Sequence, residues 1–179
     1  GVGVAFYVLA NLSSQRAKQQ KSTAKMTQYL DLVALGTYAD VASLDYNNRI
    51  LVDSGVKRIQ SGQCRAGILA LLDIAGRDPA QLKAQDLGFV IGPRINAAGR
   101  METMDIGIEC LLADTLETAY PLAQQLNDLN LERRQVEAEM KQDALSAMEN
   151  LNIDQENMPS ALIMFEEHWH QGVIGIVAG

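Results

Sequence analysis

Residues 92–100 (Gly-Pro-Arg-Ile-Asn-Ala-Ala-Gly-Arg) contain the side chains of this chain that are best suited to bind an anion. The guanidiniums of Arg94 and Arg100 can each hold two phosphate oxygens at once, and the amide of Asn96 lies between them in the sequence. The small residues that follow Asn96 allow a ligand or another chain to approach the backbone closely. We expect Arg94 to contact phosphate, because it follows the rigid Gly-Pro pair, and Arg100 to have the more structural role. The alternative is a turn whose arginines pair with nearby carboxylates.

Asp40 is the second candidate, because it lies near the end of an almost continuous apolar run at residues 29–41. By its periodicity the run suits a buried helix or a buried strand, but it is long for a strand, so we predict a helix. A carboxylate at a helix C-terminus is disfavoured by the helix dipole and needs a compensating cation. Oxygen ligands suit Mg²⁺ and Mn²⁺, so metal ligation is one hypothesis. A capping or salt-bridged aspartate is the other.

Further elements are predicted to hold these two segments in place. Apolar periodicity and glycine stop signals predict four short helices, at residues 4–12, 47–62, 67–75 and 103–112. The polar, basic residues 13–23 are typical of an exposed loop. Apolar residues at alternating steps of four and three predict one or two long helices from about residue 115 to residue 151. Such a helix either links two parts of the protein or pairs with a partner helix.

The C-terminal residues predict the start of a β-α unit. Residues 161–165 form a short apolar run typical of a strand, and residues 172–178 are typical of a helix with a glycine-rich opening. Ligands of α/β proteins bind beyond the C-terminal ends of strands, and His168 and His170 lie at that position. His170 is therefore a candidate on the substrate side of a site, and the alternative is a hydrogen-bonded structural histidine.

The composition limits the class of protein. The chain has 179 residues, a net charge of −7 and 47% hydrophobic residues, which suffices for one domain or one and a part. The negative charge argues against a nucleic-acid binder over the whole surface. Acidic residues concentrate at 114–149, so a local groove for DNA elsewhere stays compatible. We expect no membrane-spanning segment. Cys64 and Cys110 lack metal-site spacing, which predicts reduced thiols in a cytoplasmic protein.

Four segments resemble, in order, motifs of RecJ-type exonucleases, which degrade single-stranded DNA from its 5′ end and belong to the DHH phosphoesterase superfamily. Residues 32–41 (Leu-Val-Ala-Leu-Gly-Thr-Tyr-Ala-Asp-Val) are similar to the fourth conserved motif of the superfamily, and residues 44–51 follow at the RecJ spacing. Residues 92–100 are similar to a RecJ signature. Residues 168–178 resemble the opening of the DHH-associated domain. Together the motifs cover most of the chain.

The resemblance implies an α/β parent fold, of which this chain is a mainly α piece with the β-α unit near its C-terminus. It also implies metal-dependent 5′-to-3′ exonuclease activity on single-stranded DNA in repair and recombination, with two Mn²⁺ or Mg²⁺ ions. Asp40 matches a catalytic metal ligand, while Arg94, Asn96 and Arg100 would hold the DNA backbone or orient the motif that does. Single-strand-binding protein or a helicase are the expected protein partners.

Two alternative functions stay open beside this one. The first is a phosphodiesterase of the same superfamily that cleaves oligoribonucleotides or cyclic dinucleotides. Such enzymes share the aspartate motif but not, as a rule, the string at residues 92–100. The second is a non-catalytic relative that keeps the fold as a scaffold in a replication complex.

The resemblance also predicts how the chain divides. Residues 1–112 would be the C-terminal part of the catalytic domain, residues 113–152 a long linking helix or helices, and residues 153–179 the start of the DHH-associated domain. The family's Asp-x-Asp and Asp-His-His motifs are expected upstream of Gly1. We therefore expect the chain by itself to bind no metal and to be inactive.

Overall fold

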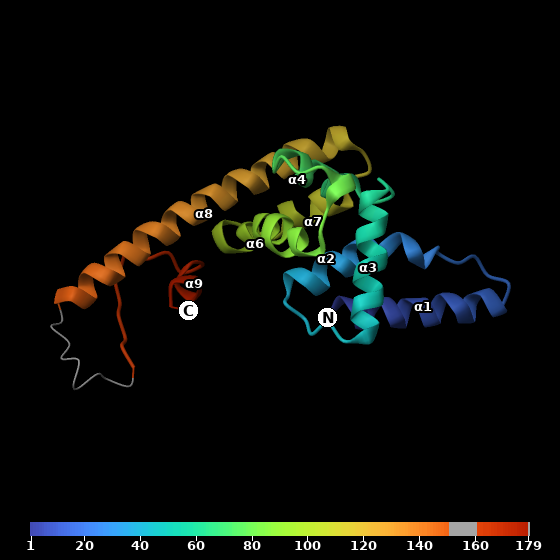
Figure 1. The fold of residues 1–179 in the computed structure, drawn as a ribbon, viewed down its shortest axis with the longest axis horizontal. Coiled ribbons are helices and arrows are strands. Elements are labelled where there is room, and N and C mark those ends of the chain that lie inside the picture. The colour runs from blue at the N-terminus through green and yellow to red at the C-terminus, as the bar shows by residue number, and fades with distance from the viewer. Residues whose placement is uncertain (151–160, 179) are drawn as a thin grey trace.

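The structure, a computed structural model, describes residues 1–150 and 161–178, and these residues are mainly helical (Figure 1). Nine α-helices are assigned in the described ranges: α1 Val2–Lys18, α2 Leu30–Ala39, α3 Tyr46–Gln60, α4 Ala66–Ile74, α5 Ala84–Asp86, α6 Gly92–Met101, α7 Asp105–Leu112, α8 Leu116–Asn150 and α9 Ile174–Val177. Shorter turns of helix lie at η1 Met26–Tyr29, η2 Pro79–Gln81 and η3 Leu87–Ile91. The mainly α character predicted for this chain is confirmed.

Most of the predicted helices lie within a few residues of the observed ones. The glycine stop signals are confirmed, because Gly62 and Gly76 follow α3 and α4 with positive φ angles of 71° and 65°. The first helix is longer than predicted. It continues to Lys18, into the segment predicted as a loop, where its polar side chains bond to each other, as Gln15 does to Asn11 at 2.9 Å.

Residues 92–100 form a helix and not a turn. Gly92 and Pro93 occupy the first turn of α6, where the missing N–H of proline costs nothing. Gly92 lies so close to α2 that an added Cβ would be 3.0 Å from the Cβ of Ala39. The glycine therefore allows a close helix crossing here. This crossing brings the start of α6 next to the end of α2.

One large apolar core joins the helices that carry the two candidate segments. It contains fully buried residues from α2, α3, α4, η3, α6, α7 and the first half of α8, among them Ala34, Ile59, Ile68, Leu71, Leu87, Ile91, Ala97, Ala98, Cys110 and Leu126. The first turns of α8 are thus part of this core. They do not form a free connection, and their apolar stripe packs on α4, α6 and α7 of the same chain.

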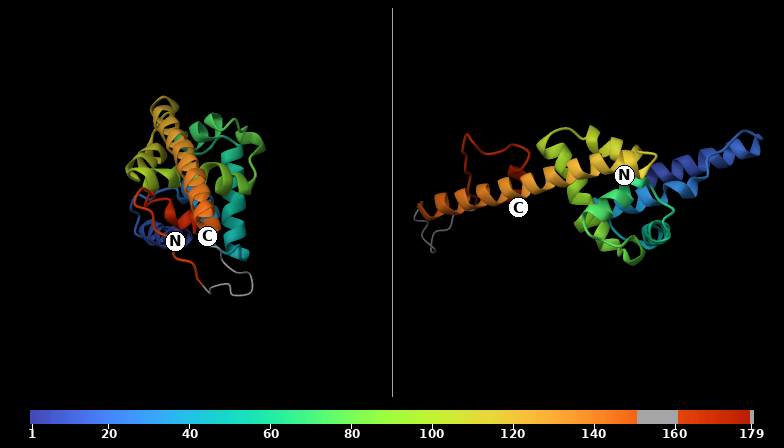
Figure 2. Two further views of the ribbon diagram at one scale, coloured as in Figure 1. Left: turned by 90° about the vertical axis from the view of Figure 1, so that its left-hand side faces the viewer. Right: turned by 90° about the horizontal axis from the view of Figure 1, so that it is seen from above.

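The molecule is elongated (Figure 2). α1 extends from one end of the core and the second half of α8 extends from the other. α1 packs on α2 through Val2 and Phe6, which contact a small cluster around Leu30, Val33 and Leu51. The C-terminal residues with α9 return along α8, where Val173 is fully buried.

The strand predicted at residues 161–165 is not formed. No residue of the described ranges is assigned to a strand, and residues 161–166 have no regular secondary structure. Ile163 and Phe165 are 93% and 83% exposed. A strand needs neighbouring strands for its backbone hydrogen bonds, and the described residues provide none. The β-α unit is therefore reduced in this chain to a turn followed by the short helix α9.

None of the helices in the described part of the chain has the length and apolar composition needed to span a membrane.

Candidate functional site

Asp40 lies at the C-terminal end of α2, as predicted from the sequence. It occupies the C-cap position of the helix, and it is exposed. Two backbone hydrogen bonds close the helix around it, from the amide of Val41 to the carbonyl of Tyr38 at 3.2 Å and from the amide of Ala42 to the carbonyl of Thr37 at 3.1 Å. This pattern fixes the backbone of Asp40 while its carboxylate stays accessible.

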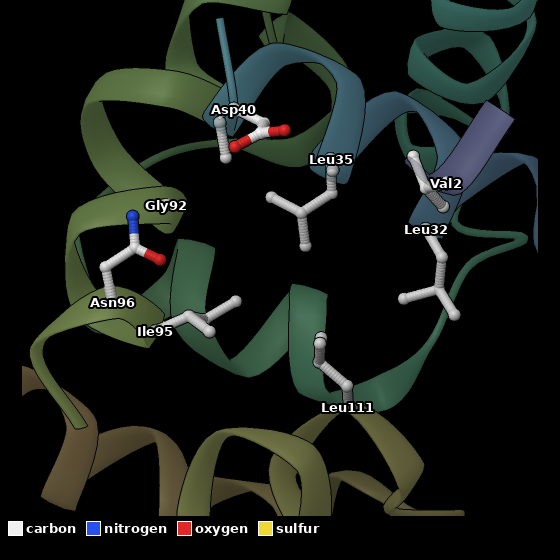
Figure 3. Close-up of a pocket in the computed structure, with 10 residues that line it drawn as sticks. Val2, Leu32, Leu35, Asp40, Gly92, Ile95, Asn96 and Leu111 are labelled. Carbon is white, nitrogen blue, oxygen red and sulfur yellow. The ribbon is translucent and has the colours of Figure 1, made fainter. Parts of the chain in front are cut away.

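The carboxylate of Asp40 and the amide of Asn96 face the same hollow (Figure 3). The hollow has a volume of about 450 Å³ and lies between the end of α2 and the start of α6. The rest of its lining is apolar, namely Val2, Leu32, Leu35, Gly36, Ala39, Gly92, Ile95 and Leu111. Two candidates that are 56 residues apart in sequence numbering (96 minus 40) are thus brought together by the α2–α6 crossing.

The helical conformation of residues 92–100 separates Arg94 from the other two candidates. Asn96 and Arg100 are four residues apart and lie on one face of α6. Arg94 lies two residues before Asn96, about 200° around the helix. Its half-buried guanidinium donates from Nε to Oδ1 of Asn127 on α8 at 3.1 Å and from Nη1 to the carbonyl of Val90 at 2.7 Å. Arg94 therefore points toward α8 and away from the hollow.

Arg100 is exposed and contacts the C-terminal segment. Its Nη1 donates to the carbonyl of Gly172 at 3.2 Å. Gly172 lies so close to α6 that an added Cβ would be 2.0 Å from the carbonyl oxygen of Arg100. A side chain at residue 172 would therefore push this segment off the end of α6.

His170, the remaining candidate, is half-buried in the same segment. Its Nδ1 accepts a hydrogen bond from the amide of Gly172 at 3.1 Å, which orients the ring locally. The neighbouring Trp169 is half-buried, and its Nε1 has no hydrogen-bond partner within the described residues. His170 does not line the hollow of Asp40 and Asn96, so the structure does not bring it together with them.

The donor set fits a hard divalent cation in kind but does not complete a site. The carboxylate of Asp40 and the amide oxygen of Asn96 are ligands that Mg²⁺ and Mn²⁺ accept. Residues 1–150 and 161–178 contain no group of three or more His, Cys, Asp or Glu side chains that could hold a metal ion. Any metal here would need further ligands from elsewhere in a longer protein.

Two residues beside Arg94 were not predicted from the sequence. Asn127 accepts its hydrogen bond, and Arg134 on α8 lies close enough for its positive charge to act on the guanidinium. Burial lowers the pKa of Arg94, and the positive charge of Arg134 lowers it further. Both residues lie on the exposed or half-buried side of a long helix. No local pattern could have indicated that they meet a residue more than thirty positions earlier.

Val41, directly after Asp40, has a positive φ angle of 50° and is 89% exposed. This conformation costs a β-branched residue about 1–2 kcal/mol, and glycine adopts it freely. Val41→Gly should therefore stabilise the chain by about 0.5–1 kcal/mol, measured by urea unfolding. Ala42→Gly, at a residue without positive φ, is the control and should destabilise. Equal losses for both variants would contradict the strain at Val41.

His168 pairs with Asp143 of α8 across an Nε2–Oδ2 distance of 3.0 Å. The hydrogen bond to Asp143 raises the pKa of His168 above its ordinary value of 6.5, assisted by the charges of Asp143 and Glu166. Because the pKa is higher in the folded chain, the stabilisation is present below the unfolded pKa and is lost as pH rises through the folded pKa. Asp143→Asn should lower the pKa of His168 in an NMR titration, whereas Glu139→Gln should not. An unchanged pKa in Asp143→Asn would refute the contact.

Comparison with known proteins identifies close relatives. Proteins named single-stranded-DNA-specific exonuclease RecJ, from Salmonella typhimurium and Dickeya dadantii, are 49% and 47% identical to this chain over alignments of 184 residues. The alignments cover 99% of this chain and 32% of each relative, so the chain spans about a third of their length. No protein-family model matches the chain.

Two solved structures share the fold. A crystal structure of exonuclease RecJ bound to manganese matches with a TM-score of 0.77 and 32% identity, over 95% of this chain and 41% of that one. The structure of RecJ from Thermus thermophilus in complex with Mn²⁺ matches with a TM-score of 0.76 and 33% identity, over 93% of this chain and 24% of that one.

The helical fold of the described residues is thus that of a segment of a DHH-type phosphoesterase. Within this class, the identity over nearly the whole chain shows that the chain belongs to the RecJ family.

Proposed function

We propose that this chain is part of a metal-dependent exonuclease that hydrolyses phosphodiester bonds of single-stranded DNA in the 5′-to-3′ direction. The observation that carries the proposal is the meeting of Asp40 and Asn96 at one hollow, in a chain whose relatives are named for this activity. The 5′-to-3′ direction rests on the family resemblance alone. Because the chain spans about a third of those relatives, the activity belongs to the full-length parent protein.

Asp40 would provide one oxygen ligand to a divalent ion, Mn²⁺ or Mg²⁺, with two ions in the parent protein. Bound ions of this kind activate a water molecule and stabilise the charge that develops on the phosphate and the leaving oxygen. Support comes from the accessible carboxylate, held by the capped end of α2, and from relatives whose structures contain Mn²⁺ or Mg²⁺. The described residues lack a complete ligand set, so the isolated chain should be inactive.

Asn96 and Arg100 share a face of α6 and would hold the DNA backbone near Asp40. The amide of Asn96 can donate to a phosphate oxygen or orient the carboxylate, and Arg100 reaches the C-terminal segment next to it. Arg94 would contact the DNA backbone from the opposite side of α6. His170 would act on the substrate only if the C-terminal segment moved toward the hollow, since its ring is now bonded to the amide of Gly172.

We further propose repair and recombination as the setting, with single-strand-binding protein or a helicase as partner, on the strength of the family resemblance alone. A cytoplasmic location is supported by Cys64 and Cys110, which form no disulfide. Burial raises the pKa of each thiol to about 11, so both stay in the thiol form at neutral pH. The division at residues 112 and 152 also stays a proposal. The packing of the first half of α8 on α4, α6 and α7 supports counting that half with the proposed catalytic part and the rest with the linking helix.

The experiment that tests the function compares substrates. The purified full-length protein with Mn²⁺ should release nucleotides from single-stranded DNA bearing a label at one end, with much slower release from duplex DNA. Preference for short oligoribonucleotides or cyclic dinucleotides would favour the alternative phosphodiesterase. Absence of hydrolysis with every substrate, in protein that is folded and loaded with metal, would favour a non-catalytic scaffold.

A further inference from the structure

Arg94 is unusual because its charge is half-buried without a carboxylate partner in the part of the chain that the structure describes. Its two hydrogen bonds there go to neutral acceptors, Oδ1 of Asn127 and the carbonyl of Val90. The ion pairs that arginines form among the described residues are those of Arg65 and Arg133. Taking a guanidinium partly out of water without a counter-charge is costly. The guanidinium of Arg94 is therefore expected to bind an anion when the protein binds its substrate.

The guanidinium of Arg134, on α8, lies beside that of Arg94, on α6. Arg134 follows Asn127 by seven residues, which places both on one face of the helix, toward α6. Arg134 is exposed, and its charge contributes to the lowered pKa of Arg94. Two acidic residues of this part of α8 have other partners: Glu137 pairs with Arg133, and Asp128 accepts from the amide of Gln124.

The two like charges thus lie close together within a chain of net charge −7. Two arginines that repel each other, with the neutral Asn127 bonded to one of them, form a site that an anion with several oxygens would stabilise. The helix α6, whose diameter with side chains is about 10 Å, separates this site from the hollow of Asp40 and Asn96. One phosphate could not contact both.

We propose that Arg94 and Arg134 form a phosphate-binding subsite between α6 and α8, which holds a backbone phosphate of single-stranded DNA at a nucleotide away from the one at Asp40. The inference rests on the proposed function and deepens it, because it adds a second contact for the same substrate. Such a contact is independent of base identity, as phosphate contacts are, and it depends on salt.

Binding of an oligothymidylate to the full-length protein, followed by fluorescence anisotropy in EDTA over a range of salt concentrations, tests the subsite. Arg134→Ala should weaken binding and lower the slope of log affinity against log salt by about 0.7, the value for one phosphate contact on a single strand. Arg77→Ala removes another exposed arginine, outside the subsite, and should leave the slope unchanged.

A double-mutant cycle links the two arginines. If both hold one phosphate, Arg94→Ala with Arg134→Ala should lower the slope little further than either change alone. Melting curves accompany each variant, because Arg94→Ala also removes the bonds to Asn127 and Val90. Arg134→Ala should melt at or above the wild-type temperature, since it relieves the repulsion between the two arginines.

The outcomes separate the subsite from the proposed function. A wild-type slope for Arg134→Ala, in protein that binds and cleaves single-stranded DNA normally, would overturn the subsite and leave the function intact. A fall in melting temperature for Arg134→Ala with an unchanged slope would show that the pair meets a carboxylate of the parent protein instead. Wild-type protein that neither binds nor cleaves single-stranded DNA would overturn both.

Discussion

Asp40→Ala in the full-length parent protein is expected to abolish cleavage of single-stranded DNA and to leave the fold intact. Asp40 is exposed and its side chain caps no backbone group of α2, so its removal costs little stability. If it is one of a few carboxylates that hold the metal, its loss removes the charge that keeps the ion at the phosphate. The measurement is the turnover rate at saturating Mn²⁺, with a melting curve for the fold.

Asp78→Ala is the matched control for this variant. Asp78 is also an exposed aspartate next to a helical element, at the start of η2, where it accepts a hydrogen bond from the amide of Ala80 at 2.9 Å. Its loss should cost about 1 kcal/mol of stability, as the loss of a cap does, without affecting cleavage. Near-normal turnover of Asp40→Ala at saturating Mn²⁺ would show that Asp40 is not a catalytic ligand.

Asp31→Ala is expected to destabilise this chain by about 3–5 kcal/mol, the range for breaking a buried ion pair. Asp31 is fully buried at the first turn of α2, and its carboxylate accepts from the backbone amide and the guanidinium of Arg65. Arg65 also bonds to the carbonyl of Gln28 and lies over the ring of Tyr29. Without Asp31 the half-buried charge and amide of Arg65 lose their partner.

Asp53→Ala is the control, because Asp53 pairs with Lys57 on the exposed face of α3. An exposed pair of this kind contributes about 0–1 kcal/mol. Urea unfolding of the two variants should therefore differ by several-fold in the free energy lost. A loss for Asp31→Ala no larger than that for Asp53→Ala would mean that the buried pair does not anchor α2, the helix that positions Asp40.

The sequence predicted the helices whose signals are local. The apolar run that became α2 and the glycines after α3 and α4 carry their information within a few neighbouring residues. Residues 92–100 were harder, since a glycine-proline pair indicates a turn as readily as a helix start. Burial of Ala97 and Ala98 in the core decided for a helix. The strand at 161–165 failed for the opposite reason, because strands depend on neighbours that the described residues do not supply.

The candidate site was predictable as two separate pieces and not as one arrangement. The position of Asp40 at a helix end followed from its own segment. Its meeting with Asn96 depends on the close crossing at Gly92, which no local pattern reveals. The prediction that Arg94, more than Arg100, contacts phosphate also depended on the assumption that Gly92 and Pro93 form a turn. In the helix, Arg94 points to Asn127 and Arg134, and its role in binding stays a prediction.

Whether Asp40 holds a catalytic metal can be measured by anomalous diffraction from crystals of the full-length protein soaked in Mn²⁺. An anomalous peak is expected at about 2 Å from a carboxylate oxygen of Asp40, the distance typical of a small divalent ion bound by oxygen. The peak should lie at the hollow shared with Asn96. A fully occupied manganese centre elsewhere in the protein, with the carboxylate of Asp40 free of metal, would show that Asp40 is not a metal ligand.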